Sequence, residues 1–430
     1  MVLTRRRALV AGAASASLLD WANAWAASQP FTPEKGAQLL LLRPTVIQPG
    51  EGDALAANIA AFSAATGVSV QTETYPPEDI PGRNVLYLAN TAGADVCWAP
   101  GGTAHLVNDR MINVSEITDY LASKYGPWTP LARDYGMQYG RWFNVPATIT
   151  GVPMAYRVSW LRQAGFESFP KTTDELLRLC QALKRIGHPA GFALGRSFTE
   201  GNCFAYWLLW AFGGQVANES NRPALESDRT LAAIEYLRQL YPNLAPGILG
   251  WKDGSGSAAF LAGECGLTNA TAALYTQAKR TTPAIAADMA FAPMPIGPVG
   301  MPTAMARVDS MMIYRYEKYP QASKALITFL MEAPQYPKLV TGAAGFVTPV
   351  LQGFGNNPLF QSDPKLTWFA TAGQDARPLC WPQAANQGAA QVFAYFVVQE
   401  MFAAAGSGQV EPRVAMRRAQ QQVERLYRYG

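Results

Sequence analysis

The chain has 430 residues, of which 49% are hydrophobic and 15% are charged. This length suits two domains of moderate size, and the apolar fraction is enough for a packed core, which excludes an intrinsically disordered chain. The formal net charge is only +4, and the basic residues are scattered. Because no basic block is present to neutralise phosphates, the composition does not support a nucleic-acid partner.

The first residues predict an export signal over residues 1–26. Residues 4–9 contain paired arginines, residues 8–19 form a weakly apolar run, and small-x-small cleavage sites end at Ala24 and at Ala26. The run is too short and too rich in Ala, Gly and Ser to span a bilayer. The arginine pair favours the twin-arginine type over the general secretory type, and either type sends the mature chain out of the cytoplasm. No cysteine follows the cleavage sites, so a lipid anchor is not expected.

Strands and helices alternate in the first part of the mature chain. Strands are predicted at 38–47, 68–75 and 94–99, and helices at 53–65 and 84–92, with a turn at 48–50. This alternation is typical of an α/β domain with a mainly parallel sheet. Ligands bind beyond the carboxyl ends of strands in such sheets, so the loops 48–53 and 98–104 are expected at the binding edge.

The rest of the mature chain continues with short strands and longer helices. Strands are predicted at 150–156, 192–194, 265–269, 289–293 and 310–314, and helices at 159–164, 173–186, 202–212, 228–240, 257–263, 321–331 and 411–427. The apolar stretch 388–405 is interrupted by Gln391, Gln399 and Glu400, and so predicts a buried helix and not a membrane span. We find no repeat or low-complexity linker, so two domains would be joined by short crossing segments.

The cysteines and histidines give no sign of a metal site, a cofactor or an enzyme. The five cysteines have no CxxC or zinc spacing and are Cys97, Cys180, Cys203, Cys265 and Cys380. Their number is odd, and buried free thiols are favoured over a disulfide. His105 and His188 cannot form a triad or a metal site and are interpreted as surface or packed residues. Catalytic motifs such as G-x-S-x-G and H-E-x-x-H are absent, although paired carboxylates for glycoside cleavage need no motif.

Six segments carry a family resemblance through their order and spacing. They are Phe62–Val70 with its Thr-Gly turn, Gly93–Val96, the run from Gly151 through Glu175-Leu176, Ala259–Glu264, Pro293–Gly297 and Ala322–Met331. Together they resemble extracellular solute-binding proteins of ABC importers, of the maltose-binding type (family 1). One departure is the stretch 264–267, Glu-Cys-Gly-Leu, where many relatives have Lys-Ala-Ala-Met. That difference puts the adjacent pocket loop in doubt.

The resemblance implies an α/β, two-lobed periplasmic-binding-protein fold (type II) with the ligand in a cleft between the lobes. Lobe one would take residues 37–148 and 300–352, and lobe two would take residues 149–299 and 353–430. Closure would be a hinge motion driven by the contacts that the closed state makes with the ligand. The chain would be a monomer in the periplasm, and its closed form would dock on the transmembrane subunits of an ABC permease.

A sugar or polyol ligand requires flat aromatic surfaces and hydrogen-bonding side chains in fixed places. Trp98 directly follows a buried strand, Trp251 precedes a Lys-Asp-Gly turn, and Trp381 lies in a segment that faces the cleft in relatives. Each is a candidate for ligand stacking, and for each the alternative is ordinary packing. Trp207 and Trp210, by contrast, have the spacing of core residues in one helix.

Six polar residues complete the predicted ligand site: Gln48, Glu51, Asn202, Asn269, Arg307 and Asp309. Glu51 would alternatively stabilise a helix N-terminus through the macrodipole, and Asn202 would cap a helix. Asn269 lies where relatives place a contact. Arg307 and Asp309 would either grip the ligand or pair with each other as a hinge salt bridge.

Two other functions stay open from the sequence. The same fold would bind a phosphorylated polyol through Arg, Lys or a helix N-terminus, or a polyamine through carboxylates that line the cleft. A secreted carbohydrate-active enzyme is the alternative of a different class. The binding protein is preferred because it accounts for the whole chain, whereas hydrolysis accounts only for carboxylates.

Overall fold

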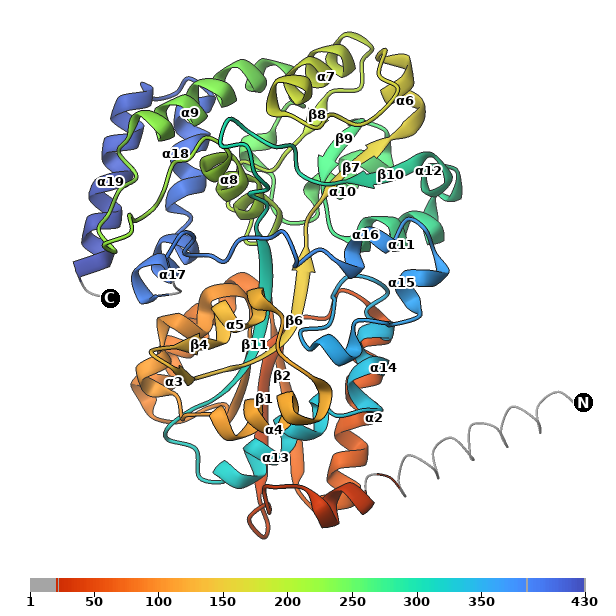
Figure 1. Cartoon of the computed structure of the whole chain (residues 1–430), viewed down its shortest axis with the longest axis vertical. Coiled ribbons are helices and arrows are strands. Elements are labelled where there is room, and N and C mark those ends of the chain that lie inside the picture. The colour runs from red at the N-terminus through yellow and green to blue at the C-terminus, as the bar shows by residue number, and fades with distance from the viewer. Residues whose placement is uncertain (1–20, 22, 384–385, 429–430) are drawn as a thin grey trace, which may run out of the picture.

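The computed structural model describes residues 21, 23–383 and 386–428, and the predicted arginine pair and apolar run of the export signal lie outside these residues. The chain forms two α/β halves, drawn one above the other in Figure 1, each around its own sheet. We use lobe one for the half around the five-stranded sheet and lobe two for the half around the four-stranded sheet. The two-lobed fold predicted from the sequence is confirmed.

The sheet of lobe one has the strand order β2-β1-β3-β11-β6. Its strands are β1 (Gln38–Pro44), β2 (Ser69–Tyr75), β3 (Val96–Ala99), β6 (Val145–Gly151) and β11 (Ala306–Ile313). Strand β1 is parallel to β2 and β3, whereas β11 is antiparallel to β3 and β6. Strand β6 therefore runs in the same direction as β1, β2 and β3, so the sheet is mainly parallel as predicted, and β11 is its one antiparallel strand among the described residues. The reason is that β11 enters from lobe two, at the carboxyl edge of β3, and must run the opposite way.

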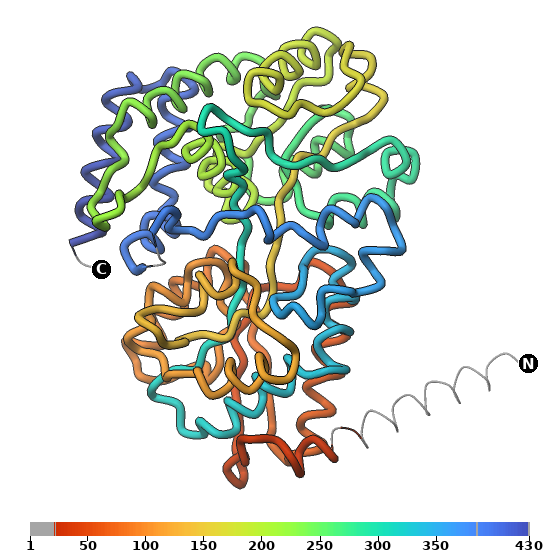
Figure 2. Tube along the Cα trace, viewed as in Figure 1, coloured from red at the N-terminus to blue at the C-terminus, as the bar shows by residue number. Residues whose placement is uncertain are grey.

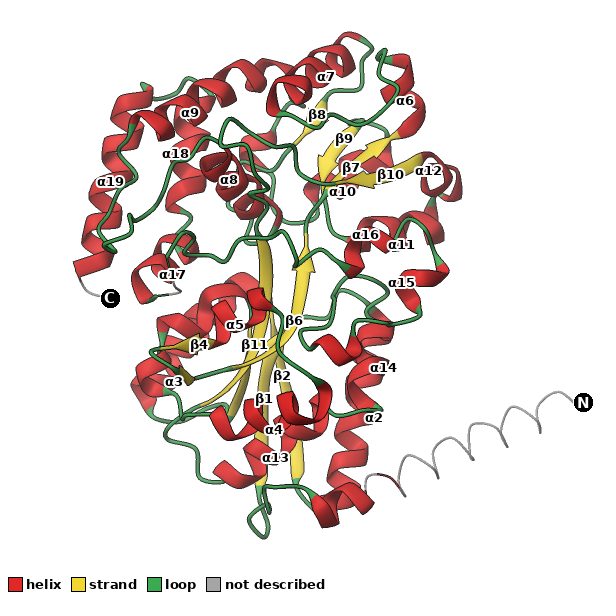
Figure 3. Cartoon of the chain, in the orientation of Figure 1, coloured by secondary structure: helices red, strands yellow, loops and turns green. Residues whose placement is uncertain are grey.

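Helices cover both faces of this sheet (Figure 3). They are α2 (Pro49–Thr66), α3 (Ile80–Asn90), α4 (Ser115–Tyr125), α5 (Pro130–Gly136), α13 (Pro320–Met331) and α14 (Gln335–Gly342), with a small hairpin of β4 (Met137–Gln138) and β5 (Arg141–Trp142). The predicted turn at residues 48–50 is instead the first turn of α2, because a proline at that position loses no helical hydrogen bond. Gly67 ends α2 with φ 75°, a left-handed conformation that favours glycine.

The sheet of lobe two has the order β10-β7-β9-β8. Its strands are β7 (Met154–Arg157), β8 (Ala190–Gly191), β9 (Leu267–Asn269) and β10 (Met289–Ala292). The predicted strand at residues 192–194 is wrong, since β8 ends at Gly191. The backbone amide of Leu194 donates instead to the carbonyl of Ile248, 3.0 Å away, so this segment pairs with a loop.

Lobe two is rich in helices. They are α6 (Val158–Gln163), α7 (Thr173–Arg185), α8 (Glu200–Ala211), α9 (Asp228–Leu240), α10 (Ser255–Ala262), α11 (Ala272–Thr281), α12 (Pro283–Asp288), α18 (Val397–Gly406) and α19 (Pro412–Arg428). Thr172 and Glu175 form the capping box that opens α7. Every residue of α8 is buried, so the prediction that Trp207 and Trp210 belong to the core is confirmed.

Three stretches of chain connect the lobes (Figure 2). The predicted strand 150–156 is in fact two strands in two sheets, with Val152-Pro153 between β6 and β7. The chain returns between Ala292 and Ala306, and it leaves lobe one again after α14, through α15 (Leu359–Ser362), α16 (Thr367–Ala370) and α17 (Gln387–Ala394). Strand β6 extends past the predicted lobe boundary at residue 148, and the other boundaries stay predictions.

The apolar stretch 388–405 is two helices and not one. Phe396 has φ 57°, which breaks the helical path between α17 and α18. All five cysteines are buried with free thiols. Among the residues that the structure describes, no helix combines the length and the apolar character needed to cross a membrane.

Candidate functional site

A small cavity of about 20 Å³ lies in lobe one at the carboxyl edge of β1, β3 and β6 and the amino end of β11. It is lined by Arg43, Pro44, Thr45, Ile47, Glu51, Pro77, Trp98, Thr148, Arg307, Asp309, Phe346 and Val347. Four of the nine predicted ligand residues meet here: Glu51, Trp98, Arg307 and Asp309. This edge is where the sequence placed the binding loops.

The first charged pair in the cavity joins β1 to α2. Arg43 Nη2 lies 2.7 Å from Glu51 Oε1, and both side chains are buried. The Arg43 guanidinium also lies 5.2 Å from the ring centre of Trp98, a cation–π arrangement. Its Nη1 is buried and has no hydrogen-bond partner. Arg43 therefore has one donor nitrogen, Nη1, left to offer, and such a buried group costs about 1–3 kcal/mol until it finds an acceptor.

The second charged pair lies within β11. Arg307 donates from Nε to Asp309 Oδ1 at 2.8 Å and from Nη2 to Asp309 Oδ2 at 3.0 Å, a bidentate pair. The backbone amide of Gly101 donates to the same Oδ1 at 3.2 Å. Burial lowers the pKa of Arg307, but the Asp309 carboxylate outweighs it, so the pKa is raised overall. The Arg307 guanidinium thus stays charged, in a site that holds two arginines and two acidic residues.

Arg307 also links the two lobes. Its Nη1 donates to Thr199 Oγ1 at 2.6 Å, and Thr199 immediately precedes α8 in lobe two. Asp253 holds the segment 197–200 in place. Its carboxylate accepts hydrogen bonds from the backbone amides of Thr199 and Glu200 at 2.9–3.1 Å and from the hydroxyl of Ser197. The lobes are therefore in direct polar contact beside the cavity.

The lobe-two side of this contact carries polar atoms that have no partner. Asn269 donates from Nδ2 to the carbonyl of Glu200 at 2.8 Å, and Asn202 donates from Nδ2 to the carbonyl of Phe198 at 3.3 Å. The Oδ1 of each asparagine is buried without a hydrogen bond. Burial, and then the Asp253 carboxylate, raises the pKa of Glu200 to about 8. Lobe two therefore contains two buried acceptor oxygens without a partner, on residues that do not line the cavity.

The remaining predicted residues lie outside the cavity lining. Gln48 precedes α2 and is buried, and its carbonyl accepts from the amide of Glu51 at 3.0 Å. Trp251 packs against Gly191 in lobe two. Trp381 packs on Trp210 with ring centres 5.8 Å apart. Both tryptophans pack against neighbours and are partly exposed, and their contact with a ligand stays a prediction.

Sequence reasoning missed Arg43, Thr199 and Asp253. Arg43 had a visible signal, because it is a charged residue that directly follows the apolar run 39–42 at the predicted binding edge. Thr199 and Asp253 had no such signal in the sequence. They are 54 residues apart and meet only through the packing of the loop before α10 on the start of α8.

The cavity is too small in this conformation for a sugar. Its volume is about that of one water molecule. Thr45 and Ile47 at its rim are exposed, whereas Arg43 and Trp98 at its base are buried. All of its lining residues belong to lobe one.

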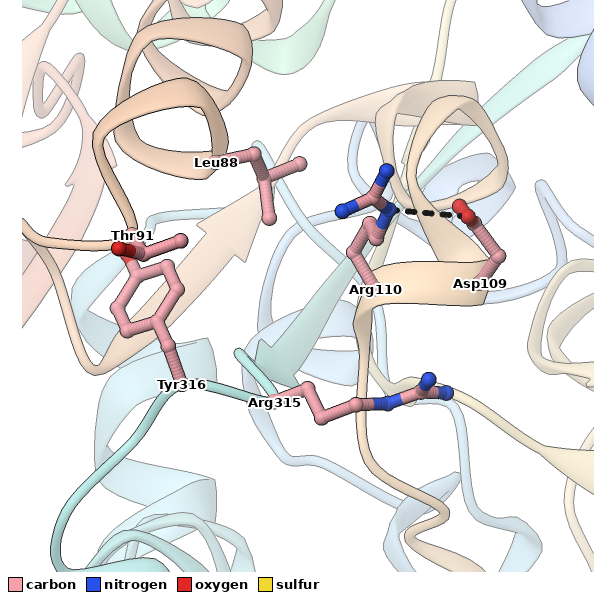
Figure 4. Close-up of a pocket in the computed structure, with 6 residues that line it drawn as sticks. All are labelled: Leu88, Thr91, Asp109, Arg110, Arg315 and Tyr316. Carbon is pink, nitrogen blue, oxygen red and sulfur yellow. Dashed lines mark hydrogen bonds and ion pairs between the residues drawn. The ribbon is translucent and has the colours of Figure 1, made fainter.

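A larger cavity of about 430 Å³ lies elsewhere in lobe one (Figure 4). It is lined by Leu88, Thr91, Asp109, Arg110, Arg315 and Tyr316. These residues lie at the amino edge of β3 and the carboxyl end of β11, the edge that faces away from lobe two. Asp109 and Arg110 form a salt bridge, and the side chain of each is more than half exposed. We therefore assign the site to the smaller cavity, whose charged groups are buried and fixed.

His105 is close to the predicted binding edge but does not line the cavity. It is buried in the 3₁₀ helix Gly101–Leu106, and burial lowers its pKa to about 4, so it is neutral at pH 7. Among the described residues, no group of three His, Cys, Asp or Glu side chains is placed to hold a metal ion.

Comparison with known families decides the class of protein. The family described as bacterial extracellular solute-binding protein matches residues 57–368, which is more than half of the chain. The chain belongs to this family. The resemblance seen in the six sequence segments is thereby confirmed.

Curated relatives and solved structures agree with this assignment. A protein of Brucella abortus (strain 2308), described as a binding protein, is 22% identical over 241 residues, or 55% of this chain and 58% of the relative. A Deinococcus radiodurans protein, described as an ABC transporter-binding protein, is 23% identical over 211 residues, or 47% of this chain and 49% of the relative. The chain thus spans less than two thirds of either relative.

The fold is shared with solved solute-binding proteins. Maltose-bound MalE3 of T. maritima has a TM-score of 0.78 at 20% identity and covers 91% of this chain and 100% of its own. A sugar transporter protein of Arthrobacter chlorophenolicus A6 with bound laminaribiose has a TM-score of 0.79 at 18% identity, with 91% and 99% covered. An ABC transporter solute-binding protein of Agrobacterium radiobacter K84 in complex with ribitol has a TM-score of 0.77 at 17% identity. The match covers 92% of this chain and 100% of that protein. At these identities the likeness shows the fold alone.

Proposed function

We propose that this solute-binding protein serves an ABC importer and binds a neutral sugar or polyol in the cleft between its lobes. The cavity at the edge of β1 and β3 is the lobe-one half of the site, and the start of α8 is the lobe-two half. The maltose, laminaribiose and ribitol of its structural neighbours support a polyhydroxylated ligand. After export to the periplasm, the closed monomer would deliver the ligand to the permease.

The observation that carries the proposal is the balance of buried charge. Arg43 is paired with Glu51, and Arg307 is paired with Asp309, so the lining has no net charge. A hydroxyl group can donate to a carboxylate and accept from the spare Nη1 of Arg43 at the same time. A phosphate would meet two carboxylates and a polyamine would meet two guanidiniums, and either would add an unbalanced charge to a buried site.

Binding requires the lobes to open and close. The ligand would enter when the contact between Arg307 and Thr199 is broken, and the closed state would be favoured only by the contacts it adds to the ligand. The buried Oδ1 atoms of Asn202 and Asn269 are acceptors that ligand hydroxyls would satisfy from the lobe-two side.

A thermal-shift screen tests the proposal. The purified protein is heated with neutral sugars, polyols, phosphorylated polyols and polyamines at matched concentrations. We expect a raised melting temperature with at least one neutral sugar or polyol, because a ligand at a hundred times its Kd stabilises the folded state by about 2.7 kcal/mol. A shift with only the phosphorylated compounds or only the polyamines would overturn the neutral ligand.

The enzyme alternative is tested on the same samples. Oligosaccharides incubated with the protein are recovered and separated by chromatography. Recovery of intact ligand supports binding without catalysis. Any products formed in proportion to protein concentration would contradict it.

A further inference from the structure

The two cleavage sites predicted from the sequence differ by two residues, and one buried tryptophan lies between them. Cleavage after Ala24 leaves Trp25 on the exported chain, and cleavage after Ala26 removes it. Asn23 and Ala24 are exposed, Trp25 is only 4% exposed, and Ala26 is half-buried. Of the two residues that lie between the cleavage sites, Trp25 is therefore the buried one, and the bond before it joins it to an exposed residue.

Trp25 completes an aromatic cluster on the outer side of lobe one. Its ring centre lies 4.9 Å from that of Phe329 in α13, edge to face, and 6.3 Å from that of Phe62 in α2. Phe62 and Phe329 are fully buried and lie 5.5 Å from each other. Figure 1 shows the first described residues, in red, beside α2 at the foot of lobe one. Trp25 therefore packs against both of these rings.

The residues after Trp25 hold it in place. Its carbonyl accepts from the amide of Gln29 at 2.8 Å, and the hydroxyl of Ser28 donates to the carbonyl of Ala24 at 3.1 Å. Phe31 is buried next, with Lys324 Nζ 5.4 Å above its ring. Trp21, by contrast, is only half-buried and packs on the outside of the cluster, 6.5 Å from Trp25.

We infer that the signal is removed after Ala24, so that Trp25 becomes the first residue of the exported protein and its indole stays packed on Phe62 and Phe329. The inference rests on the proposed export. In a chain that is folded before cleavage, the Ala24–Trp25 bond lies at the solvent side of the cluster. Cleavage after Ala26 would instead require Trp25 to leave its aromatic contacts.

Mass spectrometry of the exported protein tests this cleavage site. The full chain is expressed in a bacterium, the protein outside the cytoplasm is purified, and its intact mass and N-terminal peptide are measured. We expect a chain that begins at Trp25. A chain that begins at Ala27, or one that keeps residues before Trp25, overturns the inference.

Truncated chains test the packing independently of export. Chains of residues 25–430 and 27–430 are made without a signal, together with a Trp25→Ala variant of the longer chain. Loss of a buried tryptophan lowers the melting temperature, and we expect the chain from 25 to melt roughly 5 °C above the other two. Equal melting temperatures would overturn the structural role of Trp25.

The ligand screen keeps this inference separate from the proposed function. Trp25 packs on α2 and α13 and does not line the cavity. A chain that begins at Ala27 and still binds a sugar contradicts only the cleavage site. A chain that begins at Trp25 and binds no sugar or polyol contradicts only the ligand.

Discussion

The two lobes satisfy the polar groups near their contact differently. In lobe one, Arg43 and Arg307 each have a carboxylate partner, and the charges sit on strands whose neighbours fix them. In lobe two, Asn202 and Asn269 keep unpartnered oxygens and Glu200 has a raised pKa. Lobe one therefore leaves one donor nitrogen, Nη1 of Arg43, without a partner, whereas lobe two leaves two acceptor oxygens without one. We expect mutations in lobe one to change stability most, and those in lobe two to change closure and pH response.

The largest effect is expected from breaking the lobe-one pair in β11. Arg307→Met leaves Asp309 buried without a cation, which should cost about 3–5 kcal/mol of unfolding free energy in urea titrations. The double variant Arg307→Met/Asp309→Leu should recover most of the loss, because it removes both charges. If the double variant were as unstable as the single one, the pair would not be the cause.

Trp98→Ala should act on both stability and binding. Trp98 is 4% exposed and supports the Arg43 guanidinium, so truncation should cost about 3 kcal/mol and weaken ligand affinity. Trp251→Ala in lobe two is the matched control, and it should lower stability without changing affinity. Calorimetric titration measures the affinity. Equal losses of affinity in both variants would contradict the assignment of the cavity.

Glu200→Gln tests whether Glu200 in lobe two makes the stability of the protein depend on pH. Because the pKa of Glu200 is about 8 in the folded protein against an ordinary 4.5, the folded state keeps a proton that the unfolded chain releases. The contribution of Glu200 to stability should therefore be greatest below pH 4.5 and should fall as the pH rises toward 8. The amide variant should flatten this slope and gain up to about 3 kcal/mol near pH 7. Melting temperatures measured from pH 4.5 to 8 check this, and an unchanged slope would rule out Glu200 as the source.

The smallest effect is expected from Thr199→Val, which removes the acceptor of the contact between Arg307 and lobe two. The unfolding free energy should fall by only about 1 kcal/mol, since the rest of the Arg307 network remains. The unliganded protein should populate more of an open form, seen as a larger radius of gyration in small-angle scattering. Thr328→Val, inside α13 of lobe one, should leave the radius unchanged. A constant radius in both would show that this contact does not hold the lobes.

The sequence predicted those residues of the cavity lining whose position one strand end can determine. Trp98, Arg307 and Asp309 lie at or beside strand ends that apolar patterning marks, so their place at the binding edge follows from strand direction. Whether Trp251 and Trp381 faced the cleft or packed inside could not be read, since that depends on contacts with Gly191 and Trp210.

The parts that sequence could not predict are made by distant contacts. The link between Arg307 and Thr199 joins residues 108 positions apart in two lobes, and no local pattern encodes it. The split of 150–156 into β6 and β7 has the same origin, because the alternation of side chains continues while the strand changes sheet. Periodicity identifies an element but not its partner.

The most direct test of the account is the affinity of the best neutral sugar or polyol for Arg43→Lys. Lysine keeps the charge that balances Glu51. It has no counterpart of Nη1, the guanidinium nitrogen of Arg43 that has no hydrogen-bond partner in the protein. Arg157→Lys, which changes an equally short pair with Asp288 in lobe two, is the matched control. The account predicts about tenfold weaker binding, or 1.4 kcal/mol, for Arg43→Lys and no change for the control. Equal affinities for the wild type and Arg43→Lys would contradict it.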